Sequence, residues 1–338
     1  MKKIINAPDK VIQDMIEGMR LASPDIRILP GTSVIVRADA PVKGKVGLIS
    51  GGGSGHEPAH GGFVGTGMLD AACAGDVFTS PSVDQMMEAV RAVDSGQGVL
   101  IIAKNYTGDN LNFDMAMELL ADEGIRTEKV VVHDDIAVEE SPNTTGRRGV
   151  AGTVLVQKVA AACAEQGNDL ETVKRAAQDA ADHVRTFGFA LSPCTIPSVG
   201  KPSFSLAEDE MELGTGIHGE AGVKRMKVPG ARALAEQMTE AILKDMPVES
   251  GEEVCVLVNG MGATPLMELY IIYKEVHSLL TERGIKIAKA YVGEYMTSLE
   301  MAGASVSVMK LDEKRKQYLL APADTLGFKQ FASKQSEV

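Results

Sequence analysis

The feature that most constrains this chain is a short apolar run that opens into a cluster of glycines. Residues 46–49 are apolar and predict a buried strand. Glycine then occupies positions 51, 52, 53 and 55, and His56 follows directly. Glycine permits positive φ and close backbone approach, whereas an ordinary turn needs only one or two glycines. The stretch 46–60 therefore predicts a ligand-binding loop at the carboxyl end of a sheet.

Composition indicates a globular protein and argues against nucleic-acid binding. The chain has 338 residues, of which 44% are hydrophobic and 24% charged, and this length is enough for two domains. The net charge is −12, Trp is absent, and aromatic residues make up 4%. An acidic chain with few aromatic side chains lacks the positive field and the stacking platforms that nucleic acids require.

The sequence also predicts a cytoplasmic protein with no membrane association. The first ten residues contain three lysines but no apolar core of signal-peptide length. No window holds the roughly 18 apolar residues that cross a bilayer. The cysteines are far apart and form no Cys-x-x-Cys pair, which argues for a reducing compartment and against a zinc knuckle. They are Cys73, Cys163, Cys194 and Cys255.

Alternating strand and helix patterns predict an α/β fold with two domains, each a largely parallel or mixed sheet flanked by helices. Besides 46–49, apolar runs predict strands at 33–37, 98–104, 129–133, 254–258, 285–292 and 304–310. Helical spacing predicts helices near 9–22, 109–124, 152–166, 170–185, 230–245 and 264–284. The composition changes around 187–200. We therefore expect a first domain at 1–190, with the glycine-rich loop, and a second at 191–338.

Two of these helices have recognisable signals at their ends. In the helix near 109–124, Leu111, Met115 and Leu119 share a face, and Gly124 ends the helix. The dipeptide 264–265, Thr-Pro, is a favourable pair for the N-cap and the first position of the later helix.

Two matches to enzyme motifs are weak. Residues 56–60, His-Glu-Pro-Ala-His, match the zinc-protease pattern His-Glu-x-x-His, which needs both histidines on one continuous helix. Glycines flank this stretch and Pro58 lies within it, so we expect no metal there. Residues 214–219, Gly-Thr-Gly-Ile-His-Gly, match the dinucleotide fingerprint, but an acidic segment precedes them. A metal or nicotinamide enzyme is therefore the weakest hypothesis.

Three titratable side chains remain as candidates for chemistry. His56 leaves the glycine loop and suits a general acid or base. His218 lies between glycines and on no apolar helix face, although a surface-loop histidine would fit the same pattern. Asp109 is either a helix N-cap or a carboxylate at the sheet edge, close to Lys104 in sequence. No P-loop occurs, and the loop 51–55 could hold a phosphate or a small polar ligand through its N–H groups.

Three motifs in this order resemble those of the dihydroxyacetone kinases. They are GGGSGHEPAHGGFVGTGMLDAACAGDVFTSP from residue 51, KNYTGDNLNFDMA from residue 104 and GTGIHGEAGVKR from residue 214. The resemblance covers nearly all of the chain, with one small departure at Ala221, where proline is common. The length resembles that of the substrate-binding subunit of the bacterial multi-subunit system. One-piece, ATP-dependent members of the family carry a further nucleotide-binding helical domain, which we do not expect here.

The resemblance implies a covalent mechanism. His218 matches the histidine whose ring nitrogen adds to the ketone of dihydroxyacetone and forms a hemiaminal, a step that rejects polyols such as glycerol. His56 matches the residue that assists proton transfer at the carbonyl oxygen, and Asp109 matches the base that activates the terminal hydroxyl. The site should therefore close between the two halves of a chain or between partner chains. The implied substrate-binding positions are Gly53, Ser54, Gly55, His56, Lys104, Asp109 and His218.

The resemblance also implies partners. The phosphoryl group would arrive on ADP, with Mg²⁺, held by a separate helical subunit that a phosphocarrier of the phosphoenolpyruvate-dependent system recharges. This chain would carry no cofactor of its own, would form a homodimer and would help to make dihydroxyacetone phosphate. The alternative is a paralogous regulator that binds dihydroxyacetone and activates transcription without phosphoryl transfer. The joint presence of His56, Asp109 and His218 favours the kinase subunit.

Overall fold

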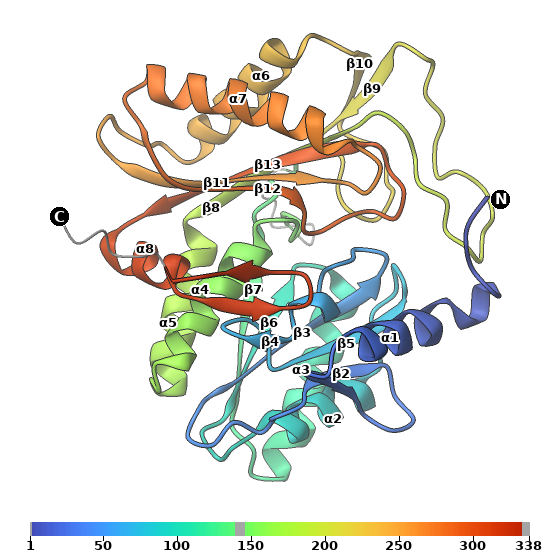
Figure 1. The fold of residues 1–338 in the computed structure, drawn as a ribbon, viewed down its shortest axis with the longest axis vertical. Helices are drawn as coiled ribbons and strands as arrows, with labels where there is room; N and C mark the ends of the chain where they lie inside the picture. Colours follow the sequence, from blue (N-terminus) through green and yellow to red (C-terminus); the bar gives the residue numbers. More distant parts are fainter. Residues whose placement is uncertain (1, 139–145, 333–338) are drawn as a thin grey trace.

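The computed structural model describes residues 2–138 and 146–332. A six-stranded sheet forms the centre of each half of the molecule, and a small three-stranded sheet bridges the halves (Figure 1). Helices flank both large sheets, so the predicted α/β class with a mixed sheet in each half is confirmed.

The first sheet has the strand order β1-β2-β5-β3-β6-β7. The bounds are Ile26–Ile28 (β1), Val34–Arg37 (β2), Ala71–Val77 (β5), Gly47–Ser54 (β3), Val99–Lys104 (β6) and Thr127–Val132 (β7). The last four strands in this order are parallel, whereas β1 and β2 are antiparallel additions at one edge. Parallel strands share a carboxyl edge, which is where open α/β sheets bind ligands.

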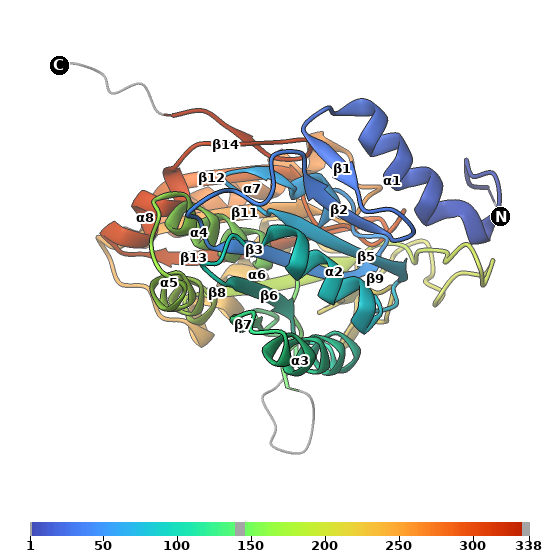
Figure 2. The same ribbon diagram turned by 90° about the horizontal axis from the view of Figure 1, so that it is seen from below.

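Helices cover both faces of the first sheet because its central strands are apolar on both sides. On β6, Ile101 packs with α2 (Val83–Val93) and α3 (Thr107–Asp122), whereas Ile102 belongs to the core shared with α4 (Thr153–Glu165) and α5 (Leu170–Asp182). Figure 2 shows α1 (Val11–Ala22), preceded by a 3-10 turn at Pro8–Lys10, beside β1 and β2 at the outer edge of this sheet.

The second sheet has the order β10-β9-β8-β13-β11-β12 and is antiparallel except between β11 and β12. The bounds are Lys224–Lys227 (β10), Glu210–Leu213 (β9), Val184–Ala190 (β8), Gly303–Leu311 (β13), Glu253–Gly260 (β11) and Lys286–Glu294 (β12). Val256 of β11 faces α6 (Ala231–Asp245) and α7 (Leu266–Glu282), whereas its neighbour Leu257 faces the central core. Because side chains alternate between the two faces of the strand, one face of the second sheet packs against α6 and α7 and the other packs against the central core, which includes α4.

The end of the chain returns to the first half. After α8 (Glu313–Leu320), β14 (Ala323–Thr325) pairs with β15 (Lys329–Gln330) and with β4 (Gly65–Thr66), which follows a 3-10 turn at Gly61–Phe63. The Tyr291 hydroxyl of β12 donates to Gln330 Oε1 at 2.7 Å, so the same small sheet also contacts the second half. The division into domains 1–190 and 191–338 stays a prediction. The second sheet begins at Val184, and the last strands pair with the first half.

Two details of the predicted helices differ from the structure. Leu111, Met115 and Leu119 do share a face of α3, but that face is exposed, while Phe113 and Leu120 are buried. Helix α7 has Pro265 rather than Thr264 as its N-cap, and the Thr264 hydroxyl instead bonds both the N–H and the carbonyl of Gly303 at 2.7 Å. The predicted end of α3 at Gly124 is confirmed by its φ of 79°.

Candidate active site

An open cavity of about 490 Å³ lies beyond the carboxyl ends of β3 and β6, where the two halves of the chain meet. It brings together three of the residues that the sequence singled out, namely Gly53, Asp109 and His218. The residues that complete its lining are Phe78, Ser80, Tyr106, Gly108, Arg148 and Glu220.

The glycine cluster is part of a strand rather than a loop. The predicted strand was expected to end at Ile49, but β3 continues to Ser54 and pairs with β5 through this stretch. Glycine is needed because the neighbours come close: a Cβ on Gly51 would lie 2.9 Å from Cys73 Cβ, and one on Gly53 would lie 2.5 Å from the Thr79 nitrogen. The strand therefore presents bare backbone to the cavity.

The two ends of the predicted loop are turned inward. The Ser54 hydroxyl donates to the Gly75 carbonyl at 2.7 Å, so it faces the sheet. Gly55 has a φ of 105°, and its N–H donates to Glu57 Oε1 at 3.0 Å. Since this N–H is already bonded, the expectation that the loop cradles a phosphate through its N–H groups finds no support at Gly55.

His56 is fully buried and has one ring nitrogen without a partner. Its Nδ1 lies 2.9 Å from the Thr297 carbonyl, an acceptor, so Nδ1 carries the proton and Nε2 has a free lone pair. Among the described residues, Nε2 has no hydrogen-bond partner. The ring stacks on Phe78 at 5.2 Å and meets the His218 ring edge to face at 4.8 Å. A bound molecule beside His218 is thus the available partner for Nε2.

His218 is fixed through its backbone. Its N–H donates to Glu220 Oε2 at 2.8 Å, and Glu220 Oε1 accepts from Arg148, which also pairs with Asp135 at 2.6 Å. This chain of charges ties the glycine-rich segment 214–219 to the end of β7. The Tyr106 ring packs edge-on against the His218 ring at 4.3 Å. The ring is therefore confined by His56, Phe78 and Tyr106, and His218 lines the cavity.

Both histidines stay neutral near pH 7. Burial, with the charges of Lys104 and Arg148, lowers the pKa of His218 to about 3. Burial, followed by the charges of His218 and Lys104, holds the pKa of His56 well below its usual range. A neutral imidazole has an unprotonated nitrogen that can act as a nucleophile or a base.

Asp109 lies in the first turn of α3, but it is not the N-cap, a position that Tyr106 occupies. The carboxylate is buried, which raises the pKa of Asp109, while the charge of Lys104 and the Ser80 hydroxyl oppose this rise. Both charged groups lie on the same side of Gly52: a Cβ there would lie 2.5 Å from Lys104 Nζ and 3.2 Å from Asp109 Oδ2. The arrangement suits a carboxylate that takes a proton beside a fixed cation.

The structure also bears on the two weak motifs. Residues 56–60 form turns, and His56 and His60 have different partners, Thr297 and Lys104, so the motif lacks the helical geometry of a zinc protease. Within residues 2–138 and 146–332, no group of three or more His, Cys, Asp and Glu is placed to hold a metal ion. The segment 214–219 follows β9 but leads into no helix, as a dinucleotide fingerprint would require.

The cavity contains six residues that sequence reasoning did not assign to it: Phe78, Ser80, Tyr106, Gly108, Arg148 and Glu220. Phe78 has a φ of 56°, which is unusual for a large side chain, and its ring contacts the rings of both histidines. Glu220, two residues after His218, could have been noticed from sequence. Arg148 could not, because its role depends on contacts between distant segments.

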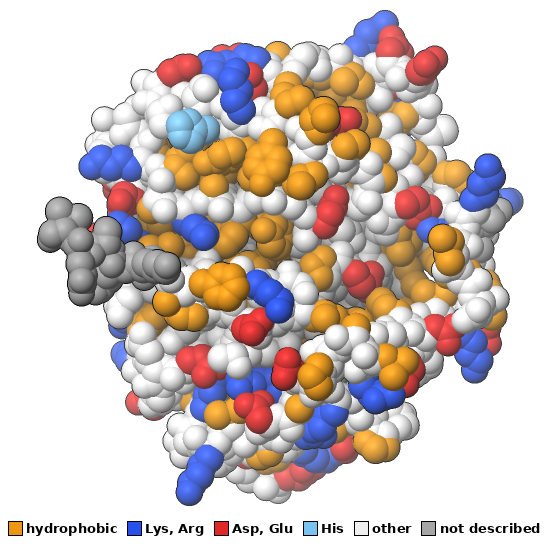
Figure 3. Space-filling model, viewed as in Figure 1, with side chains coloured by type: hydrophobic (Ala, Val, Ile, Leu, Met, Phe, Trp, Pro, Cys, Tyr) orange, Lys and Arg blue, Asp and Glu red, His pale blue; other side chains and the backbone are white. Residues whose placement is uncertain are grey.

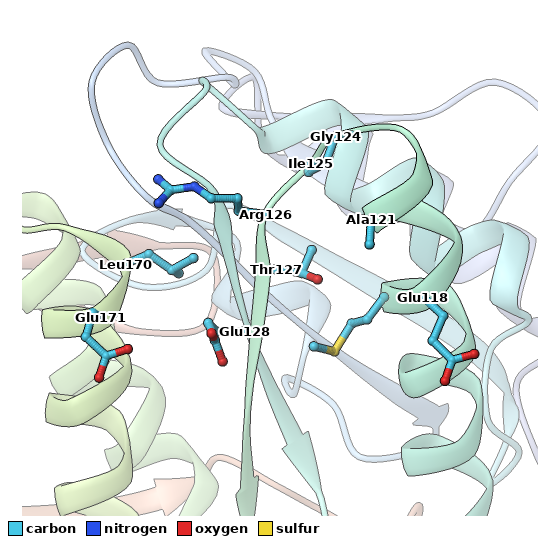
Figure 4. Close-up of a pocket in the computed structure, with 10 residues that line it drawn as sticks. Glu118, Ala121, Gly124, Ile125, Arg126, Thr127, Glu128, Leu170 and Glu171 are labelled. Atoms are coloured by element: carbon cyan, nitrogen blue, oxygen red, sulfur yellow. The ribbon is translucent and has the colours of Figure 1, made fainter.

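A larger groove, of about 620 Å³, lies at the other end of the first sheet, at the start of β7 (Figure 4). Glu118 from α3 and Glu171 from α5 face it from opposite sides, with Glu128 and Arg126 between them. Glu128 is paired with Lys174 at 2.7 Å. This groove lies at the start of β7, whereas His56 and His218 lie beyond the carboxyl ends of the parallel strands. Its larger size therefore does not make it the site of chemistry.

Comparisons with known proteins agree with this geometry. Residues 17–327 match the model of the Dak1 domain. A Listeria innocua protein described as PTS-dependent dihydroxyacetone kinase 1, dihydroxyacetone-binding subunit DhaK, is 54% identical over 97% of this chain and 100% of its own length. The Escherichia coli PEP-dependent dihydroxyacetone kinase, dihydroxyacetone-binding subunit DhaK, is 42% identical over 96% of this chain and 98% of its own.

Solved structures give the same result. The dihydroxyacetone kinase of C. freundii superposes with a TM-score of 0.88 at 36% identity, over 100% of this chain and 62% of that longer chain. A dihydroxyacetone kinase operon co-activator, Dha-DhaQ, superposes with a TM-score of 0.89 at 36% identity, over 94% and 98% of the two chains. Fold and sequence together define a protein of the dihydroxyacetone kinase class. This chain belongs to the Dak1 family.

Proposed function

We propose that this chain is the dihydroxyacetone-binding subunit of a phosphoenolpyruvate-dependent dihydroxyacetone kinase. The observation that carries the proposal is a cavity lined by a neutral His218 and the carboxylate of Asp109, with the ring of a neutral His56 in contact with the His218 ring. Similarity to subunits named for this activity, over nearly the whole length of each, supports it further.

The first step is addition of His218 to the substrate carbonyl. An unprotonated ring nitrogen of His218 bonds to the carbonyl carbon while the C=O π bond breaks. The ring of His218 releases its other proton, and the free Nε2 of His56, whose ring centroid is 4.8 Å away, takes this proton and passes it to the new alkoxide. The product is a neutral hemiaminal. Glycerol has no carbonyl and cannot form this bond, so the step selects ketones and aldehydes.

The second step is phosphorylation of a terminal hydroxyl of the bound substrate. Asp109 accepts the hydroxyl proton as the oxygen attacks phosphorus, and burial, which raises the pKa of this carboxyl, makes it a stronger base. Lys104 lies beside Asp109, whose charge opposes the lowering of the Lys104 pKa by burial. Gly53, Ser54 and Gly55 shape the strand end against which the substrate lies. The P–O bond to the donor nucleotide breaks as the new P–O bond forms. The hemiaminal then collapses: its hydroxyl gives up a proton through His56, the C–N bond breaks, the His218 ring regains its proton, and dihydroxyacetone phosphate leaves.

The phosphoryl donor belongs to a partner. A solved structure of the C. freundii kinase is in complex with AMP-PNP and Mg²⁺, and this chain matches 61% of that longer chain. We infer that ADP and Mg²⁺ are held by a separate helical subunit, which a phosphocarrier recharges from phosphoenolpyruvate. This chain then needs no cofactor of its own.

We also propose a homodimer. Four exposed apolar side chains lie together on α7, where Figure 3 shows apolar surface: Leu266, Met267, Tyr270 and Ile271. The outermost strand of the second sheet, β12, packs next to this helix and has no further strand on its outer side among the described residues. Contiguous exposed apolar surface of this kind marks protein interfaces. Light scattering after gel filtration would measure the mass in solution.

A cytoplasmic location is part of the proposal. All four cysteines are free and buried, as expected in a reducing compartment. None of the described helices is long and apolar enough to cross a membrane.

The second candidate function is a regulator that binds dihydroxyacetone without transferring phosphate. The superposition on a protein named as an operon co-activator is the observation that favours it. Such a regulator would need the adduct on His218 but not a base at Asp109.

One experiment separates the two functions. The chain is mixed with an ADP-loaded helical subunit, its phosphocarrier and phosphoenolpyruvate, and formation of dihydroxyacetone phosphate is followed. Product that depends on dihydroxyacetone and is lost in His218→Ala supports the kinase subunit. A covalent adduct without any product would support the regulator. Glycerol serves as the control substrate, and ATP alone as the control donor.

A further inference from the structure

Two buried side chains behind the glycine-rich strand, Lys104 and His60, are in direct contact, and only Lys104 has a role in the proposed mechanism. Lys104 Nζ lies 2.8 Å from His60 Nε2, and both side chains are shielded from solvent. Lys104 also donates to the Gly51 carbonyl at 3.4 Å. His60 has no part in the proposed chemistry. Its imidazole nevertheless contacts the cation directly.

The contact fixes the tautomer of His60. An ammonium group can only donate hydrogen bonds, so Nε2 of His60 must be the acceptor. Burial, together with the charge of Lys104, holds the pKa of His60 well below its usual range, so the ring is neutral. A neutral ring carries one proton, and here that proton is on Nδ1.

The surroundings of Nδ1 agree with this assignment. Nδ1 lies 2.9 Å from the amide nitrogen of Gln157, a residue of α4 that is completely buried. Gln157 Oε1 has no hydrogen-bond partner among the described residues. Exchanging the two ends of this amide, which have the same shape, lets Nδ1–H donate to Oε1 and moves the amide nitrogen to the position without a partner. Nδ1 also lies 3.4 Å from the Ser50 hydroxyl oxygen, which donates its own proton to the Ile102 carbonyl at 2.7 Å and so can accept from Nδ1–H. The amide then orients the ring from the side away from Lys104.

The same geometry places Lys104 at the site. Its ammonium and the Asp109 carboxylate lie on the same side of Gly52, which has no side chain that would keep them apart. Burial lowers the pKa of Lys104, while the charge of Asp109 raises it. A buried cation of this kind needs acceptors that hold it in place, and His60 provides the shorter of the two protein contacts that Nζ makes among the described residues.

We propose that His60 is a positioning residue of this site, whose neutral imidazole, oriented by Gln157, holds the Lys104 ammonium beside Asp109. The inference deepens the proposed function and rests on it for the roles of Lys104 and Asp109. His60 would act on the phosphoryl-transfer step, through the cation, and not on formation of the adduct at His218.

The first test needs no activity. In a ¹⁵N-histidine NMR spectrum of the full chain, His60 should appear as the neutral tautomer with its proton on Nδ1, and should not titrate between pH 5.5 and 8.5. Lys104→Met should change the Nε2 shift of His60. A proton on Nε2 or ordinary titration would overturn the proposal. The groups that face Lys104, and so share its electrostatics, are His56, His60, Asp109 and His218.

The second test uses matched variants in the reconstituted phosphorylation assay. His60→Leu removes the acceptor, whereas His60→Gln keeps an oxygen that can accept from Lys104. We expect kcat to fall about tenfold or more in His60→Leu with KM changed less than about twofold, because a misplaced group costs transfer rate. His60→Gln should recover most of kcat. Equal losses in both variants, or a loss confined to KM, would contradict a positioning role.

Two further measurements test whether a lower rate in His60→Leu comes from loss of the adduct or from loss of the fold. Mass spectrometry of the dihydroxyacetone adduct should show normal loading of His218 in His60→Leu, and thermal unfolding should show that the variant is folded. His277→Leu, which changes an exposed histidine of α7, is the matched control and should behave as the unmodified chain. If the unmodified chain makes neither adduct nor product, the proposed function fails. The NMR tautomer still decides whether His60 accepts from Lys104.

Discussion

The ring of His56 meets the ring of His218 edge to face with centroids 4.8 Å apart, although one residue belongs to the first half of the chain and the other to the second. Neither ring carries a charge near pH 7, because burial lowers the pKa of both. One ring can therefore release a proton as the other accepts it. Any change that separates the halves should remove the chemistry without changing either side chain.

Replacement of His218 should abolish the adduct. In His218→Ala no ring nitrogen is available to the carbonyl carbon, so intact-mass spectrometry should show no added dihydroxyacetone and the kinase assay no product. His277→Ala is the control. An adduct that persists in His218→Ala would assign the nucleophile to another residue.

Asp109→Asn should separate binding from transfer. The amide keeps the size of the side chain but cannot accept the hydroxyl proton, so product formation should fall by about 10²- to 10⁴-fold while the adduct still forms. Asp114→Asn changes an exposed carboxylate on the same helix and should leave the rate unchanged. Full turnover by Asp109→Asn would show that another group is the base.

Gly52→Ala should disturb Lys104 and Asp109 together. The new Cβ would lie 2.5 Å from Lys104 Nζ, and the φ of 153° at this position is strained for any other residue. We expect weaker substrate binding and slower transfer, measured as adduct fraction and kcat. Gly96→Ala, at a φ of 87° with open space around it, adds strain without a clash and should change neither quantity.

Adduct formation should persist in mild acid. Because the pKa of His218 is lowered to about 3 from 6.5, its nucleophilic neutral form is retained when the pH falls through 6.5. An ordinary histidine would be about 90% protonated at pH 5.5. The adduct fraction at subsaturating dihydroxyacetone should therefore be similar at pH 7.5 and 5.5. A fall of about tenfold would mean that His218 titrates normally despite its burial and the nearby charges of Lys104 and Arg148.

The sequence predicted the parts of the fold that local patterns encode. Strands such as β6 and β11 were found from apolar runs, and α3 from its spacing and Gly124. The glycine strand was misread as a loop because glycine has a low strand propensity, and its pairing with β5, in which residues 51–53 lie opposite residues 73–75, keeps it extended. Helix α2 was not predicted, although Ser82, whose hydroxyl accepts from Gln85 N–H, is an N-cap signal.

The site was predicted only in part, because some of its residues have a local sequence signal and others do not. Glycines around His56 and His218 mark unusual backbone, and such marks are visible in a sequence. Tyr106 and Arg148 have no local signal, because their place in the cavity follows from packing between β6, β7 and the segment 214–219. Local spacing also predicted that Leu111, Met115 and Leu119 share a face, but it could not tell that the face is exposed. The roles given to the site residues remain predictions that the variants above would test.

The hydrogen bond from His56 Nδ1 to the Thr297 carbonyl has a consequence for biosynthesis. The ribosome adds His56 early and adds Thr297 only after most of the chain has been made. Until Thr297 has been added, its carbonyl cannot accept from His56 Nδ1, so the tautomer that leaves Nε2 free is not yet fixed. The hydrogen bond that prepares His56 to pass a proton can therefore form only when translation is nearly over.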